Sequence, residues 1–528
     1  CGLSLLCADN KIRGLETVFS HVLMFITFLV VAHQYRTARH ASRLVWCVFA
    51  TCTLVALFGI LQYNALDPLG LPKRYARLPL STLGNTNLVA HYLEMVIPLA
   101  VALILFGGRR SRWPMASVAI TAALGSVHLV LTVSRGGWLS AACGIGLLLI
   151  LAFRAWRWRR FAVAVIVTLA LLSPVGEFAL RSVPIGNSRT LYELLGHHAE
   201  RTWKRAITAF DEADFSRSMR VMIWTDTVSM IEANPFLGVG PGNFEYLLPS
   251  YRSVPGQRSW AKLMGKRTEV PYFAHNEYLE VWAETGIVGL ISFVWLLAAM
   301  IVPGVRFYQR GGRESGEDGD GDEDDWNRRA LTAGCVAALA AAAVHAVFSF
   351  NLQDATSAIH LWVFAGLIVG LSAPRADSST VPTHFVAHIP LRQRGHRTLA
   401  LAGGIAVAVV AAKIGLGTLI GDYYYFQALR HAKFQQYETA MGLLRRAVDW
   451  RDLSFKHHHE LGRIALHIDR YPEAEVALRR SIDLHPNNPG ALRLLSKALS
   501  ALERPAAAVP ILERAVGIDP LTLQNYTL

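Results

Sequence analysis

The chain has 528 residues, of which 52% are hydrophobic and 17% charged, whereas a soluble domain carries about 25% charged residues. Apolar residues gather in stretches of roughly 17 to 25, the length that a helix needs to cross about 30 Å of hydrocarbon, which excludes an ordinary soluble globule and indicates a polytopic membrane protein. The formal net charge of +13 lies largely in short loops between these stretches, so membrane topology explains it better than a nucleic-acid partner does.

Ten apolar stretches predict transmembrane helices, and with them an all-α, polytopic helical bundle over residues 1–420. They are 17–33, 44–63, 88–106, 115–133, 137–153, 161–176, 278–303, 330–350, 356–373 and 398–420. Every second connecting loop is rich in Arg, which predicts that these loops face the cytoplasm, the acidic loop 304–329 among them. The run Glu314–Asp325 within that loop predicts a solvated linker. The external side then holds the long helical loop 177–277 and everything after residue 420.

The six cysteines form neither a CxxC pair nor a Cys/His spacing that suits a metal, so we expect no disulfide framework, no zinc site and no cofactor. The sequence opens on Cys1 and not on Met, and no charged region precedes an apolar core. We therefore expect a piece of a longer chain, with further spans upstream.

Beyond residue 420 the composition changes, and a period of 34 residues predicts stacked helical hairpins. The pairs in register include Tyr437 and Tyr471, Ala440 and Ala474, and Pro486 and Pro520. Their order and spacing match the tetratricopeptide pattern, so residues 421–528 are expected to form an α-solenoid of tetratricopeptide repeats. Such surfaces usually bind a protein or a peptide.

Two polar turns stand at external ends of predicted spans. In Ser134-Arg135-Gly136-Gly137, Arg135 would be costly at a membrane boundary without an anionic partner, and the glycines would let a ligand approach the backbone. The alternative is an arginine that extends to lipid headgroups. The turn Gly84-Asn85-Thr86-Asn87 precedes a span that carries His91 and Glu94, and it has the alternative role of a helix cap.

A third motif begins the span 278–303. His275 would enter the helix at the membrane face, where an imidazole titrates near neutrality and can take a proton from a hydroxyl. Glu277 and Glu284 are seven residues apart and so lie near one helical face, from which either would orient the imidazole. The alternative is a hydrogen-bonded structural histidine.

The fourth motif lies in the loop 177–277. A helix containing Arg220 is followed by the segment 234–244, Asn-Pro-Phe-Leu-Gly-Val-Gly-Pro-Gly-Asn-Phe. Its glycines would cradle a phosphate as backbone nests do, although the Gly-Lys-Ser/Thr end of a nucleotide P-loop is absent.

Together the four motifs resemble the O-antigen ligase and polymerase family of bacterial inner-membrane glycosyltransferases, over about residues 80–372. His345 and the segment 348–352, Phe-Ser-Phe-Asn-Leu, look like the late conserved span of that family. The order, the spacing and the membrane side of the motifs all agree with it.

The resemblance implies metal-independent transfer of a glycan from an undecaprenyl-pyrophosphate carrier to a lipid, glycan or protein hydroxyl on the periplasmic face. It implies that His275 is the catalytic base and that Arg135 and Arg220 bind the pyrophosphate. The supporting residues would be Asn276, Glu277, Glu284, Asn85 and Asn87. Ligase, repeat-unit polymerase and protein O-glycosyltransferase share these motifs and remain open.

Two other classes of protein stay open. One is a transporter or flippase of glycolipids, whose buried charges would mark a path, although the motifs gather at one face and not near the bilayer midplane. The other is a non-catalytic membrane scaffold that presents the repeats, for which a single span would suffice.

Overall fold

The computed structural model describes seven parts of the chain, and all of their regular elements are helices. The described residues are 2–63, 79–107, 114–154, 215–252, 271–314, 323–373 and 394–518. They fall into two compact units, each treated by itself. The membrane unit comprises Cys1–Ala8, Arg13–Gly242 and Phe273–Pro374, and the hairpin unit comprises Asp9–Ile12, Asn243–Tyr272 and Arg375–Leu528.

Six helices of the described residues are long and apolar enough to cross a membrane, as a multi-pass membrane protein requires. They are α1 (Lys11–Gln34), α2 (Ala38–Tyr63), α3 (Thr86–Phe106), α5 (Arg135–Arg154), α12 (Glu277–Glu314) and α14 (Ala355–Ser372). The apolar helix α4 (Met115–Leu131) is shorter. The predicted span 161–176 lies outside the described residues. The spans predicted at 330–350 and 398–420 overlap helices α13 (Glu323–His345) and α15 (Arg394–Lys433), which are not among the six, so the total of ten stays a prediction.

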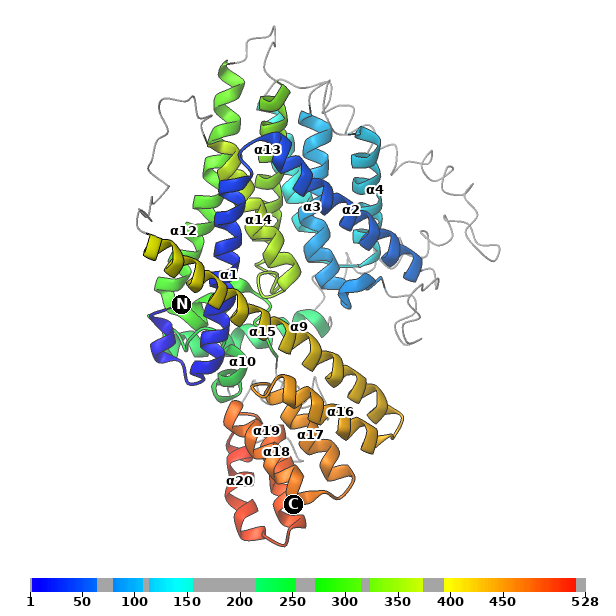
Figure 1. The fold of residues 1–528 in the computed structure, drawn as a ribbon, viewed down its shortest axis with the longest axis vertical. Coiled ribbons are helices and arrows are strands. Elements are labelled where there is room, and N and C mark those ends of the chain that lie inside the picture. The colour runs from blue at the N-terminus through cyan, green and yellow to red at the C-terminus, as the bar shows by residue number, and fades with distance from the viewer. Residues whose placement is uncertain are drawn as a thin grey trace, which may run out of the picture. The chain divides into compact units, whose positions relative to one another are not determined.

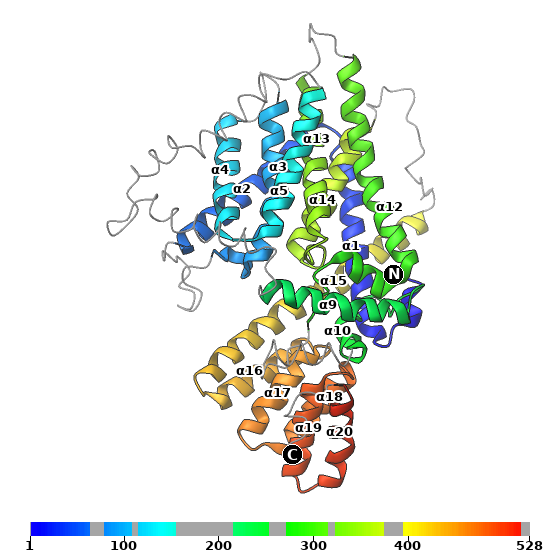
Figure 2. The same ribbon diagram turned by 180° about the vertical axis from the view of Figure 1, so that it is seen from behind.

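Helix α3 lies at the centre of the membrane unit, packed against α4, α5 and α13 (Glu323–His345). Figures 1 and 2 show α2 running obliquely across α3 and α4. Small residues let the central helices approach closely: a Cβ added at Gly334 would lie 2.6 Å from Leu99 Cδ1, and one added at Gly144 would lie 2.8 Å from the carbonyl oxygen of Ala337. Small-residue contacts of this kind are typical of helix packing in membranes.

The ends of two predicted elements need correction. Helix α13 ends at His345, and the chain turns from there to the start of α14, where the sequence predicted helix to residue 350. The loop predicted at 304–329 is helical at both ends, because α12 continues to Glu314 and α13 begins at Glu323. Ion pairs explain the second extension, since Arg329 reaches Asp325 at 2.7 Å and buried Arg328 donates to the carbonyl of Leu371.

The hairpin unit contains paired helices that repeat as the sequence predicted. They are α15 (Arg394–Lys433), α16 (Tyr437–Trp450), α17 (Phe455–His467), α18 (Tyr471–Leu484), α19 (Pro489–Ala501) and α20 (Pro505–Ile518). The turns inside successive hairpins place Gln435, Asp469 and Glu503 in left-handed backbone, with φ of 62°, 57° and 57°, at the predicted spacing of 34 residues. The predicted boundary at residue 420 falls inside the continuous helix α15. The tetratricopeptide assignment itself stays a prediction.

Part of the predicted external loop belongs to the same compact unit as the hairpins. Short helices α10 (Phe244–Leu247) and η5 (Leu248–Tyr251) carry Tyr246, whose ring lies 4.4 Å from the ring of His485 and 5.8 Å from that of Phe455. The ammonium of Lys456 is 3.9 Å from the Glu245 carboxylate. These contacts join the loop segment to the hairpins within one compact unit.

Candidate active site

The first residues of α12 are fixed by a side-chain cap. The Asn276 amide oxygen accepts hydrogen bonds from the backbone N–H groups of Tyr278 at 3.0 Å and Leu279 at 3.1 Å. The cap leaves His275 just outside the helix, with φ of 51°, a backbone conformation that few residues with a side chain adopt. Such backbone strain concentrates at functional sites. Asn276 thus supports His275 through the backbone.

The peptide ahead of His275 is held from two helices. The buried N–H of Ala274 donates to the Glu280 carboxylate at 2.7 Å, and the Ala274 carbonyl accepts from Trp224 Nε1 at 2.9 Å. Helix α9 (Phe215–Ala233) and α12 therefore fix this backbone together. Neither Glu280 nor Trp224 was predicted to support His275, because both act through the backbone of Ala274 and no residue spacing indicates such a contact.

The sequence suggested that Glu277 or Glu284 orients the imidazole. Neither does so through Nδ1, because that atom is buried and has no hydrogen-bond partner among the described residues. The Glu277 carboxylate instead accepts from the N–H of Leu352 at 2.7 Å and ties the turn after α13 to α12. The Glu284 carbonyl accepts from the N–H of Gly240 at 2.9 Å. The His275 ring packs edge-on against Phe350, with centroids 5.0 Å apart.

Arg220, on α9, acts electrostatically on two histidines of other segments. Its positive charge reaches both His275 and His345. Since Arg220 and Trp224 are four residues apart, they lie on the same face of α9, which Trp224 anchors beside Ala274. Burial lowers the pKa of His275 to about 4, and the Arg220 charge adds to that effect. The imidazole is therefore neutral at pH 7, the form that accepts a proton.

Arg135 begins α5, and the glycines after it serve helix packing. A Cβ at Gly136 would lie 2.5 Å from His345 Nε2, and one at Gly137 would lie 2.9 Å from the Cβ of Ala90. The sequence assigned these glycines to ligand approach, whereas the structure uses them to seat the start of α5 against α3 and the end of α13. This packing brings the start of α5, where Arg135 is the first residue, against His345.

A buried polar cluster lies behind these residues. His345 Nδ1 is hydrogen-bonded to the Glu94 carboxylate, and His91 Nε2 lies 2.7 Å from the Ser349 hydroxyl. The His91 and His345 rings meet edge to face at 4.6 Å. Phe350 touches His91 on one side and His275 on the other, so it joins the cluster to the candidate base. Ionisable groups inside a membrane bundle are costly and typically mark function.

The turn before α3 is a helix cap. The Asn85 side chain accepts from the N–H of Asn87 at 2.8 Å, which is the alternative that the sequence left open. Asn85 is exposed and Asn87 half-buried. Among the described residues, no hydrogen bond joins either asparagine to His275.

The glycine-rich segment does not cradle a phosphate through Val239 and Gly240. Helix α12 breaks at Gly286, where φ is 69°, and these two residues donate their N–H groups to the carbonyls of Ala283 at 3.0 Å and Glu284 at 2.9 Å. In return the N–H of Ile287 donates to the carbonyl of Pro235 at 2.8 Å. The segment 235–240 thus satisfies the backbone groups that the break exposes, and it ties the long loop to α12.

Fold and site define a multi-pass helical membrane protein whose arginines and histidines gather at the ends of α3, α5, α12 and α13. Residues 120–294, which include Arg135, Arg220 and His275, match the family described as O-Antigen ligase. An uncharacterized protein of Haemophilus influenzae is 22% identical over 306 residues, which cover 57% of this chain and 68% of that protein. The O-antigen ligase match supports a membrane glycosyltransferase-like function.

Proposed function

We propose that the chain is a metal-independent glycosyltransferase of the bacterial inner membrane, of the O-antigen ligase or polymerase type. It transfers a glycan from an undecaprenyl-pyrophosphate carrier to an acceptor hydroxyl on the periplasmic face. The observation that carries the proposal is that the Arg220 charge acts on His275, which is neutral at pH 7. Gly136, the residue after Arg135, packs against His345, on which the Arg220 charge also acts. The match to O-antigen ligase spans the same three residues.

His275 is the general base in this mechanism. Its imidazole takes the proton of the acceptor hydroxyl as the oxygen attacks the anomeric carbon of the glycan. The bond between that carbon and the carrier diphosphate breaks, and the diphosphate leaves with the electron pair. The proton stays on the imidazole until product release. A bound diphosphate would offset the Arg220 charge and raise the pKa of His275, so the base becomes stronger when the donor is present.

Arg135 and Arg220 hold the diphosphate and stabilise the charge that grows on it. A guanidinium can grip two phosphate oxygens at once, which a lysine ammonium cannot reproduce. Removing one electrostatic stabiliser of this kind usually costs about 100- to 1000-fold in rate. The buried Glu94 side chain is hydrogen-bonded to His345 and so anchors the cluster from α3.

The location of the cluster favours transfer over the alternative functions. Arg135 is the first residue of α5, His345 is the last of α13, and His275 directly precedes the α12 cap. A transport path would instead be lined near the bilayer midplane, where discontinuous helices expose backbone. A scaffold would have no use for buried ionisable groups, which membrane proteins rarely retain without function.

In this proposal the hairpins form tetratricopeptide repeats on the periplasmic side and bind a protein or peptide partner. Their contact with the loop segment 244–251 supports a common side for both. A cysteine placed at exposed Val476 should react with an impermeant thiol reagent in intact spheroplasts. Reaction only after lysis would contradict the periplasmic orientation.

Transfer is tested with the purified chain in liposomes that contain the carrier-linked glycan. His275→Ala should abolish product formation while donor binding persists, and His40→Ala, an exposed histidine on α2, is the matched control. Turnover should survive EDTA, because the arginines do the work of a divalent ion. Near wild-type turnover of His275→Ala would refute the proposal.

A deletion strain distinguishes the three types of transferase. Accumulated long carrier-linked chains indicate a ligase, and accumulated single repeat units indicate a polymerase. Unglycosylated protein indicates a protein O-glycosyltransferase.

A further inference from the structure

The hairpin unit holds a short peptide that belongs to the same chain. Tyr246, in the loop segment 244–251, is only 7% exposed. Its ring lies 4.4 Å from the ring of His485 and 5.8 Å from the ring of Phe455, and these two rings lie 4.8 Å apart. Burial lowers the pKa of His485 to about 3, so at pH 7 its imidazole is neutral and packs as an uncharged aromatic ring. Two hairpin residues thus form a site for one aromatic side chain.

Lys456 adds a positive charge to this site. Its ammonium is 3.9 Å from the Glu245 carboxylate and 3.7 Å from the centroid of the Tyr272 ring, which attracts a cation. One lysine therefore contacts two points of the loop that are far apart in the sequence. We call Phe455, Lys456 and His485 the clasp. Its chemistry suits an acidic residue that is followed directly by an aromatic residue.

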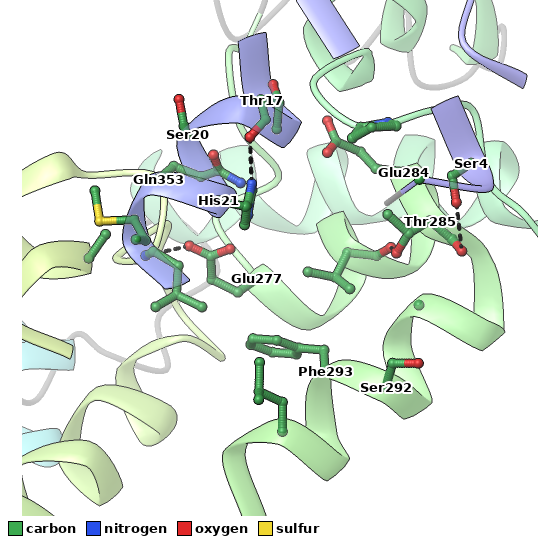
Figure 3. Close-up of a pocket in the computed structure, with 18 of the residues that line it drawn as sticks. Ser4, Thr17, Ser20, His21, Glu277, Glu284, Thr285, Ser292, Phe293 and Gln353 are labelled. Atoms are coloured by element: carbon green, nitrogen blue, oxygen red, sulfur yellow. Dashed lines mark hydrogen bonds between the residues drawn. The ribbon is translucent and has the colours of Figure 1, made fainter. Parts of the chain in front are cut away.

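The N-terminal segment is fixed in the hairpin unit as well. The Asn10 side chain donates to the carbonyl of Leu484 at 2.6 Å, and the Asn10 N–H donates to the Asn243 side chain at 2.8 Å. Earlier in the same segment, within the membrane unit, the Ser4 hydroxyl donates to the carbonyl of Thr285 at 3.4 Å (Figure 3). The segment thus runs along the chain from the break in α12 to the hairpin unit.

The held loop also continues along the chain to the candidate base. Tyr272 precedes His275 by three residues, and Phe273 between them stacks on Phe350 with ring centroids 4.7 Å apart. The other end of the held loop follows the segment 235–240, which satisfies the break in α12. The backbone of His275 has a φ of 51°, and a strained conformation of this kind persists only where its surroundings hold it. Restraint of the loop contributes to that hold.

We propose that the clasp is a peptide-recognition site for an acidic residue followed by an aromatic residue. Glu245-Tyr246 occupies it in cis, and this occupancy keeps the backbone of His275 in its working position. The effect on transfer rests on the function proposed above, whereas the peptide recognition does not. A tethered ligand acts at an effective concentration on the order of millimolar, so a partner that carries the same pair of residues competes with the loop.

Recognition is tested on the full purified chain with a fluorescent peptide of residues 243–251, Asn-Phe-Glu-Tyr-Leu-Leu-Pro-Ser-Tyr. A variant with Glu245→Ala and Tyr246→Ala has an empty clasp and should bind the peptide, whereas the wild type should bind it at least about tenfold more weakly because its own loop occupies the site. A peptide with alanine in place of its first tyrosine should not bind. Equal affinity of the wild type and the emptied variant would overturn the proposal.

Charge reversal tests the acidic half of the recognised pair. Lys456→Glu, added to the emptied variant, places a carboxylate against the glutamate of the peptide and should weaken binding at least about tenfold. A peptide with lysine in place of that glutamate should recover binding, which shows that the variant is folded. Lys497→Glu, at an exposed position on α19, is the matched control. No recovery with the lysine peptide would overturn the recognition of an acidic residue.

The effect on transfer is measured with the otherwise wild-type chain. Lys456→Glu should lower kcat about 10- to 100-fold with an unchanged donor KM, because a displaced base loses rate and not donor binding. Glu245→Lys in the same chain should recover part of the loss, and Lys497→Glu should cause none. An unchanged kcat for Lys456→Glu overturns the effect on His275 alone. The His275→Ala result separately decides the proposed function, and the peptide measurements do not depend on it.

Discussion

Glu94 on α3 and His345 at the end of α13 share a hydrogen bond inside the membrane unit, although 251 residues separate them in the sequence. Both side chains are buried, Glu94 completely. The pair joins the central helix to the turn that carries Phe350, and through Phe350 to His275. The candidate base is therefore supported from the core of the bundle.

Removing the Glu94 carboxyl, the hydrogen-bond partner of His345, should destabilise the membrane unit. Glu94→Ala leaves a buried histidine nitrogen without a hydrogen bond, which costs about 1–3 kcal/mol. Glu94→Gln keeps an acceptor and should lose less. Thermal unfolding of the purified protein measures both, with Glu232→Gln, an exposed carboxylate on α9, as the control. Equal melting temperatures for Glu94→Ala and the control would mean that the pair carries no stability.

Glu280 should act as a positioning residue for His275. Glu280→Ala leaves the buried N–H of Ala274 unpaired and lets the following histidine shift. A displacement of about 1 Å at a catalytic group can cost roughly 100-fold in turnover, so kcat should fall steeply while the donor KM changes little.

A double variant separates positioning from a purely structural defect. If Glu280 acts through His275, Glu280→Ala should add little to the loss already caused by His275→Ala, because residues that act as a unit are not additive. Trp224→Phe, which frees the Ala274 carbonyl, should behave in the same way. Full additivity of Glu280→Ala and His275→Ala would contradict the positioning role.

Hydropathy and motif spacing predicted most helices of the membrane unit and the period of the hairpins, because both depend on local sequence pattern. The same patterns brought His275, Arg135 and Arg220 forward as candidates. The partners of those residues were not predictable. Glu280 and Trp224 act through the backbone of Ala274, a contact that leaves no mark in the spacing.

The glycines also show what the sequence cannot predict. Gly136 and Gly240 have the sequence signature of a ligand cradle, yet Gly136 makes room for the His345 ring and Gly240 for the backbone of Ala8. A glycine signals close approach, and the sequence does not say what approaches. Only the tertiary structure tells whether a glycine makes room for a phosphate or for another part of the chain.

Gly286 should tolerate no side chain. Its φ of 69° favours glycine, and a Cβ would lie 2.0 Å from the carbonyl oxygen of Phe236. Gly286→Ala should therefore push the segment 235–240 away from the break in α12, at a cost of at least about 1–2 kcal/mol from backbone strain alone. The control is Gly146→Ala in α5, where a Cβ would meet no atom within 4 Å. The yield of monodisperse protein and its melting temperature should fall for Gly286→Ala only; a normal melting temperature would show that the break is not needed.

The pH dependence of transfer should report the charge of Arg220. Burial and the Arg220 charge lower the pKa of His275 to about 4, so in the free enzyme the base stays neutral far below pH 7. The acid limb of kcat/KM due to His275 should then lie near pH 4 and not near the ordinary value of 6.5. Arg220→Gln removes a repulsion that disfavours the imidazolium, which raises the pKa and moves the acid limb to higher pH. Arg220→Lys keeps the charge and should leave the limb in place, although it weakens donor binding.

In the wild type the bound diphosphate has the same effect as charge removal, so the acid limb of kcat should lie at higher pH than the acid limb of kcat/KM. Rate profiles that extend below pH 4 decide the matter: coincident limbs for wild type and Arg220→Gln would show that Arg220 does not tune the base.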